Sequence, residues 1–191
     1  MASGMTEIRW HGRGGQGAKT AAQLVALVAL EEGKCSQGFP EYGPERMGAP
    51  IRGFTRISDA KIRLRCPIEH PDVVVVLDET LVEMPAVTEA TDETTVFVVN
   101  TAVSSAEMRA KLGGAASAVY CVDATTISID ELGRSMPNTP MIGALVKATA
   151  CISMGALKKD VKKKFLKKFG ERVVAGNIRA IERAYEEAAA E

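Results

Sequence analysis

The sequence predicts an α/β fold in which a doubly wound, mostly parallel β-sheet carries a β-hairpin arm and a helical C-terminus. Three observations support this fold class. An apolar segment ends in a cluster of glycines and continues directly into a helical pattern (residues 6–32). Apolar, β-branched runs then recur, and each ends in polar residues before the next helical stretch. The last third of the chain has helical periodicity. Alternating strands and helices are typical of sheets covered on both faces.

The first elements are a strand over residues 6–10 and a helix over residues 18–32, whose apolar residues crowd one side. Gly33 follows as a C-terminal capping glycine. A second short strand is expected over residues 35–39. Proline and glycine then shape a stiff loop over residues 40–50.

A β-hairpin is predicted next. Residues 51–57 and 61–65 alternate in polarity around a turn at residues 58–60. Its strands would project Arg56, Arg63 and Arg65 from one face. We interpret this arm as a contact surface, with ordinary surface charge as the alternative.

Three further strands are expected over residues 72–78, 95–99 and 118–122, each with polar residues at its end. The first reads as a central strand buried on both faces. Ligands bind at the carboxyl edge of such sheets, which makes Asp78 a candidate contact. The favoured interpretation of Asp78 is that it caps the next helix.

The C-terminal third is predicted to be helical. Asn138 is expected to cap a helix with Pro140 in its first turn, and residues 141–154 are rich in small and apolar types that allow close packing. Residues 158–169 carry seven lysines and an apolar stripe. This basic helix could dock an acidic partner, but a solvated helix with one buried stripe is favoured. Residues 177–190 form a terminal helix. Without a linker or repeat, residues 1–191 are predicted to form a single domain.

Composition narrows the function classes. The chain has 191 residues, and 24 basic residues balance 24 acidic ones, so nucleic acid is not the default partner. No apolar run is long enough to span a bilayer and no signal peptide is recognisable, so we expect a cytoplasmic protein without membrane contact. The four cysteines lie far apart and are expected to be reduced and buried, and with only two histidines no metal site is expected from this chain alone.

The glycine-rich segment, residues 11–17, is the strongest candidate site. Glycines allow a positive φ and a close approach to the main chain, and a following helix N-terminus favours an anion such as phosphate. His11, Arg13 and Lys19 would add positive charge. A turn that only packs the helix on the sheet is the alternative. The spacing of glycines 12, 14 and 17 also fits a dinucleotide fingerprint, although Glu41, the candidate ribose-binding acid, lies in the stiff loop.

Two motifs together identify a family. Residues 11–17 and the run Gly-Pro-Glu-Arg-Met-Gly-Ala-Pro at residues 43–50 resemble the gamma subunit of the pyruvate:ferredoxin oxidoreductase family, the 2-oxoacid:acceptor oxidoreductases of the pyruvate/2-ketoisovalerate group. Residues 54–57, 71–78 and 138–144 match as well, so the resemblance runs from about Thr6 to Gly155. Arg52 departs from the pattern and leaves the substrate subclass open among pyruvate, 2-ketoisovalerate and other 2-oxoacids.

The resemblance implies a multi-subunit enzyme that oxidatively decarboxylates a 2-oxoacid with coenzyme A, giving acyl-CoA, carbon dioxide and reduced ferredoxin. It implies that thiamine diphosphate, Mg and iron–sulfur clusters belong to alpha, beta and delta-type partner subunits. This chain would be a Rossmann-like domain without catalytic residues. It would hold coenzyme A through His11, Gly12, Arg13, Gly14, Gly15, Gln16 and Gly17.

Two further expectations accompany this interpretation. Residues 39–56 are expected at a subunit interface, because large apolar groups and arginines gather in a stiff loop, namely Phe39, Tyr42, Arg46, Met47, Ile51 and Arg52. The alternative is a loop folded back on its own domain. The alternative function is a free-standing Rossmann-like NAD(P)-binding protein.

Overall fold

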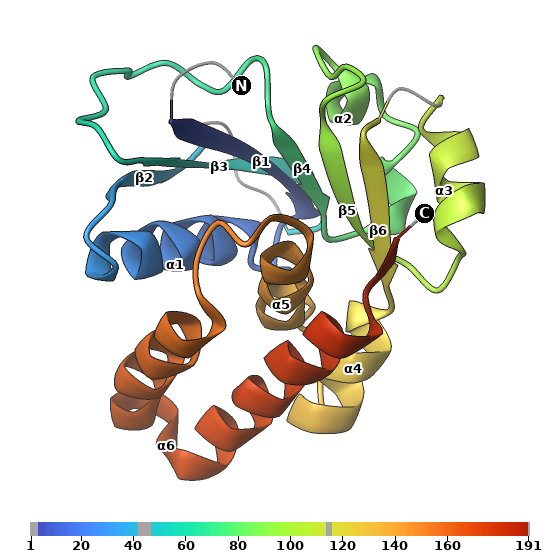
Figure 1. Ribbon diagram of the computed structural model, residues 1–191. Coiled ribbons are helices and arrows are strands. Elements are labelled where there is room, and N and C mark those ends of the chain that lie inside the picture. Colours follow the sequence, from blue (N-terminus) through green and yellow to red (C-terminus); the bar gives the residue numbers. More distant parts are fainter. Residues whose placement is uncertain (1–3, 42–46, 114–115, 191) are drawn as a thin grey trace.

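The computed structural model describes residues 4–41, 47–113 and 116–190 (Figure 1). Its centre is a seven-stranded sheet in the order β2-β3-β1-β4-β5-β6-β7. The strands are β1 (Met5–Arg13), β2 (Cys35–Pro40), β3 (Pro50–Ser58), β4 (Val73–Val76), β5 (Val96–Asn100), β6 (Ala118–Val122) and β7 (Ala189–Ala190). The helices are α1 (Ala18–Glu31), the 3-10 turn η1 (Glu79–Leu81), α2 (Pro85–Thr88), α3 (Ser105–Lys111), α4 (Ala124–Leu132), α5 (Asn138–Thr149) and α6 (Met154–Glu187).

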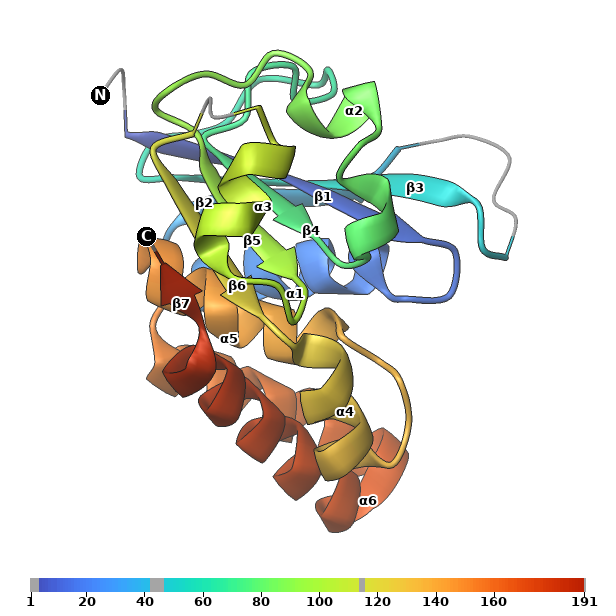
Figure 2. The same ribbon diagram turned by 90° about the vertical axis from the view of Figure 1, so that its right-hand side faces the viewer.

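The sheet is mostly parallel and doubly wound, as predicted. Strands β1, β4, β5 and β6 pair in parallel, whereas β3 is antiparallel to both β1 and β2, and β7 is antiparallel to β6. Helices α1, α4, α5 and α6 cover one face, and η1, α2 and α3 cover the other (Figure 2). The two faces carry separate apolar clusters, which is why β4 consists of four consecutive buried valines.

Strand β1 divides its side chains between the two faces. Ile8 and Trp10 are buried in the cluster under α1 and α5. The indole of Trp10 donates to Thr55 Oγ1 at 3.0 Å, and that hydroxyl donates to the carbonyl of Ala22 in α1 at 2.9 Å. Arg9 and His11 therefore lie on the opposite face, since successive side chains alternate.

Helix α5 packs closely against α6, as its small residues predict. A Cβ at Gly143 would collide with the carbonyl oxygen of Ile181. Only glycine allows this approach of the two backbones. Met141 and Leu145, on the same helix, are buried in the core cluster beneath β1 and β5.

Helix α6 joins the two predicted C-terminal helices across a break at Gly170, where φ is 79° and ψ is 172°. The second half runs back beside the first, and Lys158 Nζ bonds Glu182 Oε1 at 2.7 Å. Val161 is buried and Phe165 half-buried, whereas most described lysines of this stretch are exposed. This agrees with a solvated helix that has a buried stripe, except that Phe169, the third residue expected in the stripe, is 46% exposed.

The hairpin prediction is wrong in its pairing. Strand β3 pairs with β1 and β2, and residues 61–65 form no strand. Arg56 does not project, because its side chain is 1% exposed and its guanidinium bonds Glu7 Oε1 at 2.6 Å and the Cys66 carbonyl at 2.9 Å. Both faces of β3 are covered, which leaves no free arm. Arg63 and Arg65 are exposed.

Smaller expectations also need correction. Asn138 is the first residue of α5, after an N-cap at Pro137, and the helix ends at Thr149 because Ala150 adopts a left-handed conformation. Cys121 and Cys151 are buried, but Cys66 is exposed and Cys35 is half-buried. In the part of the chain that the structure describes, no helix is long and apolar enough to cross a membrane.

Candidate functional site

The glycine loop lies where the sheet changes its winding direction. From the carboxyl end of β1 the chain runs through α1 to β2 and β3 on one side of β1, and β4 lies on the other side. The loop therefore faces the carboxyl end of β4 and the residues that follow it. Ligands of open α/β sheets bind at this kind of switch point.

Four side chains lock the loop to the end of β4, and we call Arg13, Gln16, Asp78 and Thr80 the β1–β4 latch. The Arg13 N–H donates to Gln16 Oε1 at 2.7 Å, and Gln16 Nε2 donates to Asp78 Oδ2 at 2.6 Å. The Arg13 guanidinium bonds Thr80 Oγ1 at 2.7 Å and lies 3.3 Å from Asp78 Oδ2. A third bond from this guanidinium reaches the Gly48 carbonyl at 3.1 Å.

Asp78 has the capping role that the sequence favoured. Its Oδ1 accepts the N–H of Thr80 at 3.0 Å at the start of η1. Partial burial raises the pKa of Asp78, but hydrogen bonds from Thr80 and Gln16 and the charge of Arg13 outweigh it, so its pKa lies below the ordinary value. The latch thus holds an ionised carboxylate beside Arg13.

The loop glycines are required for two different reasons. Gly15 and Gly17 have φ values of +100° and +84°, a region that other residues rarely adopt. A Cβ at Gly17 would also lie 2.6 Å from Asn138 Nδ2. The missing side chain of Gly17 therefore allows the start of α1 to approach α5 closely. Gly12 belongs to β1, and its Cβ would lie 3.1 Å from Leu77 Cδ1. Gly12 therefore allows Leu77 to pack closely against β1, whereas a Cβ at Gly15 would meet no other atom within 4 Å.

The open side of the loop borders a hollow of about 440 Å³, lined by Gly14, Gly15, Gly17, Lys19, Thr20, Met47 and Ile51. It includes the first turn of α1, whose N-cap, Gly17, supplies no side-chain hydrogen bond. The first N–H groups of a helix have no intrahelical acceptor, and the helix dipole favours an anion there. The N–H of Gly14 is already used, because it donates to the Ala49 carbonyl at 2.9 Å.

A second hollow of about 480 Å³ lies across the carboxyl ends of β4, β5 and β6. Three carboxylates line it, those of Asp78, Glu79 and Asp123, together with several hydroxyl and amide groups. These negative charges would repel phosphate. The two sides of the loop therefore differ in charge, and an anion is favoured on the α1 side.

His11 does not carry the positive charge that the sequence suggested. It is 4% exposed on the face opposite α1, and its Nε2 accepts from Arg9 Nε at 3.1 Å. Burial, together with the charges of Arg9 and Arg52, lowers its pKa to about 3. The imidazole is therefore neutral near pH 7. The alternation along β1 places His11 on the same face as Arg9, but no local pattern in the sequence marks Arg9 as a buried arginine.

The ribose-binding interpretation of Glu41 is also wrong. Strand β3 separates β2, which precedes Glu41, from β1. The Glu41 carboxylate binds Arg52 instead, with Arg52 Nε to Oε2 at 2.7 Å. Sequence spacing alone does not reveal this inserted antiparallel strand.

The expected interface, residues 39–56, lies only partly within the described chain, because Tyr42 and Arg46 fall outside it. Phe39 is half-buried with its ring 5.3 Å from that of Phe54, whereas Met47 is 96% exposed. Among the described residues, no group of three or more His, Cys, Asp or Glu side chains could hold a metal ion.

Comparison with known proteins gives a consistent family. The family model described as pyruvate ferredoxin/flavodoxin oxidoreductase matches residues 7–187. The chain is 51% identical to pyruvate synthase subunit PorC of Thermotoga maritima, covering 95% of this chain and 93% of that protein. It is 43% identical to the pyruvate/ketoisovalerate oxidoreductases common subunit gamma of Pyrococcus furiosus, covering 95% and 96%.

Solved structures agree with this. The crystal structure of the Thermotoga maritima pyruvate oxidoreductase subunit PORC superposes with a TM-score of 0.88 at 45% identity, covering 99% of both chains. The 2-oxoglutarate:ferredoxin oxidoreductase of Magnetococcus marinus, solved with 2-oxoglutarate, coenzyme A and succinyl-CoA, shares the fold with a TM-score of 0.78. There the identity is 22%, and the match covers 96% of this chain and 31% of that one.

Proposed function

The chain belongs to the pyruvate ferredoxin/flavodoxin oxidoreductase family as a gamma subunit, and on this premise we propose that its own part in the reaction is to hold coenzyme A. The reaction converts a 2-oxoacid and coenzyme A to acyl-CoA and carbon dioxide, and ferredoxin is reduced. Pyruvate is the 2-oxoacid that we propose first. This subunit binds and orients a substrate, and the bond-breaking chemistry takes place on its partners.

The charge asymmetry of the glycine loop is the observation that carries this proposal. Coenzyme A has a pyrophosphate and a ribose phosphate, and the hollow on the α1 side offers a helix N-terminus with Lys19 and Thr20 in its lining. The hollow on the other side is lined by three carboxylates. A phosphate therefore binds in the first hollow, over Gly14, Gly15 and Gly17.

The remaining residues of the candidate site support the loop. His11 and Gly12 lie in β1 and shape the strand that leads into it. Gln16 and Arg13 hold the loop in place through the latch, and the partly exposed guanidinium of Arg13 adds positive charge at its edge. In this proposal Arg13 acts electrostatically on the bound phosphate while it stays bonded to Thr80.

The remaining cofactors follow the family resemblance. We assign thiamine diphosphate, Mg and the iron–sulfur clusters to alpha, beta and delta-type subunits. The four cysteines of this chain are dispersed over β2, the segment after β3, β6 and the segment after α5. Such a distribution does not suit ligation of a cluster.

Arg13→Ala in the assembled enzyme tests the proposal. Two unit charges roughly 8–12 Å apart at an effective dielectric constant of about 20 interact by roughly 1.4–2 kcal/mol, and about 1.4 kcal/mol corresponds to a factor of ten. Because Asp78 already offsets part of the charge, we expect the KM for coenzyme A to rise about tenfold, the lower end of that range. The KM for the 2-oxoacid should stay constant.

Arg172→Ala is the matched control, since Arg172 is an exposed arginine of α6 that lines neither hollow beside the loop. Thermal unfolding of each variant separates a folding defect from a binding defect. If Arg13→Ala assembles normally and its coenzyme A dependence is unchanged, the loop only packs α1 on the sheet and the proposal fails.

A further inference from the structure

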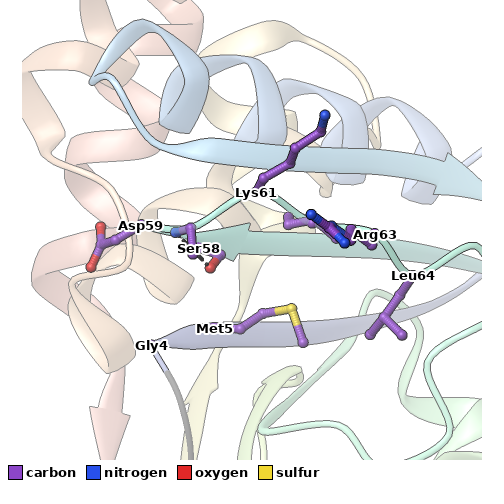
Figure 3. Close-up of a pocket in the computed structure, with 9 residues that line it drawn as sticks. Gly4, Met5, Ser58, Asp59, Lys61, Arg63 and Leu64 are labelled. Atoms are coloured by element: carbon purple, nitrogen blue, oxygen red, sulfur yellow. Dashed lines mark hydrogen bonds between the residues drawn. The ribbon is translucent and has the colours of Figure 1, made fainter.

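A groove with basic side chains lies at the opposite end of β1 from the glycine loop. We call it the basic groove. Its floor is the segment that follows β3, which consists of Lys61, Ile62, Arg63, Leu64 and Arg65. A hollow of about 480 Å³ separates this segment from the start of β1 and the end of β3 (Figure 3). A second hollow of about 420 Å³ lies between the segment and β2.

Leu64 forms the ridge between the two hollows. It lines both of them and is 43% exposed. On one side, Figure 3 shows the side chain of Met5 extending from β1 towards that of Leu64. On the other side the wall includes Phe39. Each hollow therefore presents an apolar wall that an apolar side chain can cover.

The backbone of the segment is held in place from the sheet side. Gln37 Nε2 donates to the Leu64 carbonyl at 3.1 Å, and Arg56 Nη1 donates to the Cys66 carbonyl at 2.9 Å. These bonds order a stretch without regular secondary structure. Its side chains stay available for contacts with another molecule.

The charges of the groove are mainly basic, with Asp59 as the one carboxylate in the lining of the first hollow and none in that of the second. Lys61, Arg63 and Arg65 are exposed, and within the described residues none of them forms an ion pair. The nearby carboxylate of Glu7 is taken by Arg56 at 2.6 Å. Three cations around an apolar ridge are complementary to a segment with both acidic and apolar side chains.

We infer that the basic groove binds an acidic segment of a partner subunit, with one apolar side chain on each side of Leu64 and carboxylates paired with Lys61, Arg63 and Arg65. The inference rests on the multi-subunit assembly of the proposed function but not on its coenzyme A site. The nine residues of β1 separate the two places, which corresponds to roughly 30 Å.

The test combines charge reversal with cross-linking in the complete complex. The triple variant Lys61→Glu, Arg63→Glu, Arg65→Glu should weaken association with the other subunits about tenfold or more at low salt. Leu64→Ser should weaken it at both low and high salt. A zero-length carbodiimide reagent should join Lys61 to a carboxylate of another subunit in the native complex.

The matched control reverses three lysines of α6, Lys159→Glu, Lys162→Glu and Lys167→Glu, with the same change in net charge. Equal losses in both triple variants, or no loss in the groove variant, would overturn the inference. Binding of the isolated chain to vesicles of phosphatidylglycerol, abolished by the groove variant, with no cross-link to a subunit, would assign the groove to lipid instead. The KM for coenzyme A should be unchanged in the fraction of the groove variant that still assembles. This measurement separates the groove proposal from the proposal that the glycine loop binds coenzyme A.

Discussion

His11 sits in a buried cluster of basic groups at the end of β1. Its imidazole accepts a hydrogen bond from Arg9, whose guanidinium also reaches the carbonyls of Glu69, Val87 and Glu89. A proton on His11 would break the bond from Arg9 and place two positive charges together. The cluster therefore ties the strand to the segment around α2 only while His11 is neutral.

This arrangement makes stability depend on pH in one direction. The unfolded chain protonates His11 below about pH 6.5, whereas the folded chain does so only near pH 3. The unfolded state thus binds more protons between these values, and the free energy of unfolding falls as the pH is lowered through them. We expect His11 to contribute a loss of up to about 2 kcal/mol between pH 7 and pH 5.

Urea unfolding at the two pH values measures this loss. His11→Gln keeps an acceptor for Arg9 but does not titrate, so its stability should vary less with pH. His70→Gln, at an exposed position, serves as the control. The same pH dependence in wild type and His11→Gln would contradict the assignment.

The site was only partly predictable from single residues. Gly15, Gly17 and the capping role of Asp78 follow from local backbone preference, which the sequence encodes directly. The neutral state of His11 depends on burial and on residues far along the chain, such as Arg52. It could therefore not be predicted from the residues next to His11 in the sequence. The latch between Arg13 and Asp78 likewise requires the register of β1 against β4.

At the scale of elements, the contact between α5 and α6 depends on one missing side chain. Gly143→Ala would drive a Cβ into the Ile181 carbonyl and force the helices apart. Overpacking of this kind costs roughly 1–3 kcal/mol, so the midpoint of urea unfolding should fall clearly.

Gly155→Ala is the paired control on α6. A Cβ there meets nothing within 4 Å, and because Gly155 lies in the first turn of α6, alanine should stabilise the protein by up to roughly 0.5 kcal/mol, the lower end of the effect in a helix interior. Opposite signs for the two variants are the expected result. Similar destabilisation by both variants would mean that the effect of Gly143→Ala does not come from the close contact between α5 and α6.

The strands and helices of the parallel part were predictable because each has its own pattern of polarity. The inserted strand β3 was recognised as a strand but assigned to the wrong partner. Alternation along residues 51–57 predicts a strand whose two faces have different environments. It does not predict which strands pair with it. Residues 61–65 alternate as well, yet they form no strand, and the Leu64 carbonyl accepts a hydrogen bond from the Gln37 side chain.

At the scale of the whole molecule, Met47 is the most exposed large apolar residue of the described chain. Methionine is enriched in protein interfaces, and Met47 lies beside the glycine loop. We expect Met47→Asp to weaken assembly with the partner subunits while the melting temperature of the isolated chain stays the same.

Leu30→Asp provides the comparison, because Leu30 is 57% exposed on α1. Size-exclusion chromatography of the mixed subunits reports the assembled fraction of each variant. If Met47→Asp assembles as completely as wild type, the exposed tip of the loop is not part of an interface.

The position of β1 in the middle of the sheet has a consequence for synthesis on the ribosome. Ile8 of this strand pairs with Thr55 of β3 and with Val73 of β4, so 47 further residues must be made before one edge can be covered and 65 before both can. At about 5–20 residues per second, β1 keeps at least one open edge for on the order of several seconds. During that interval the nascent chain exposes Trp10, the only tryptophan of the sequence, in a strand that can pair with other chains. Covering the edges of β1 until β3 and β4 emerge would therefore protect the nascent chain from aggregation.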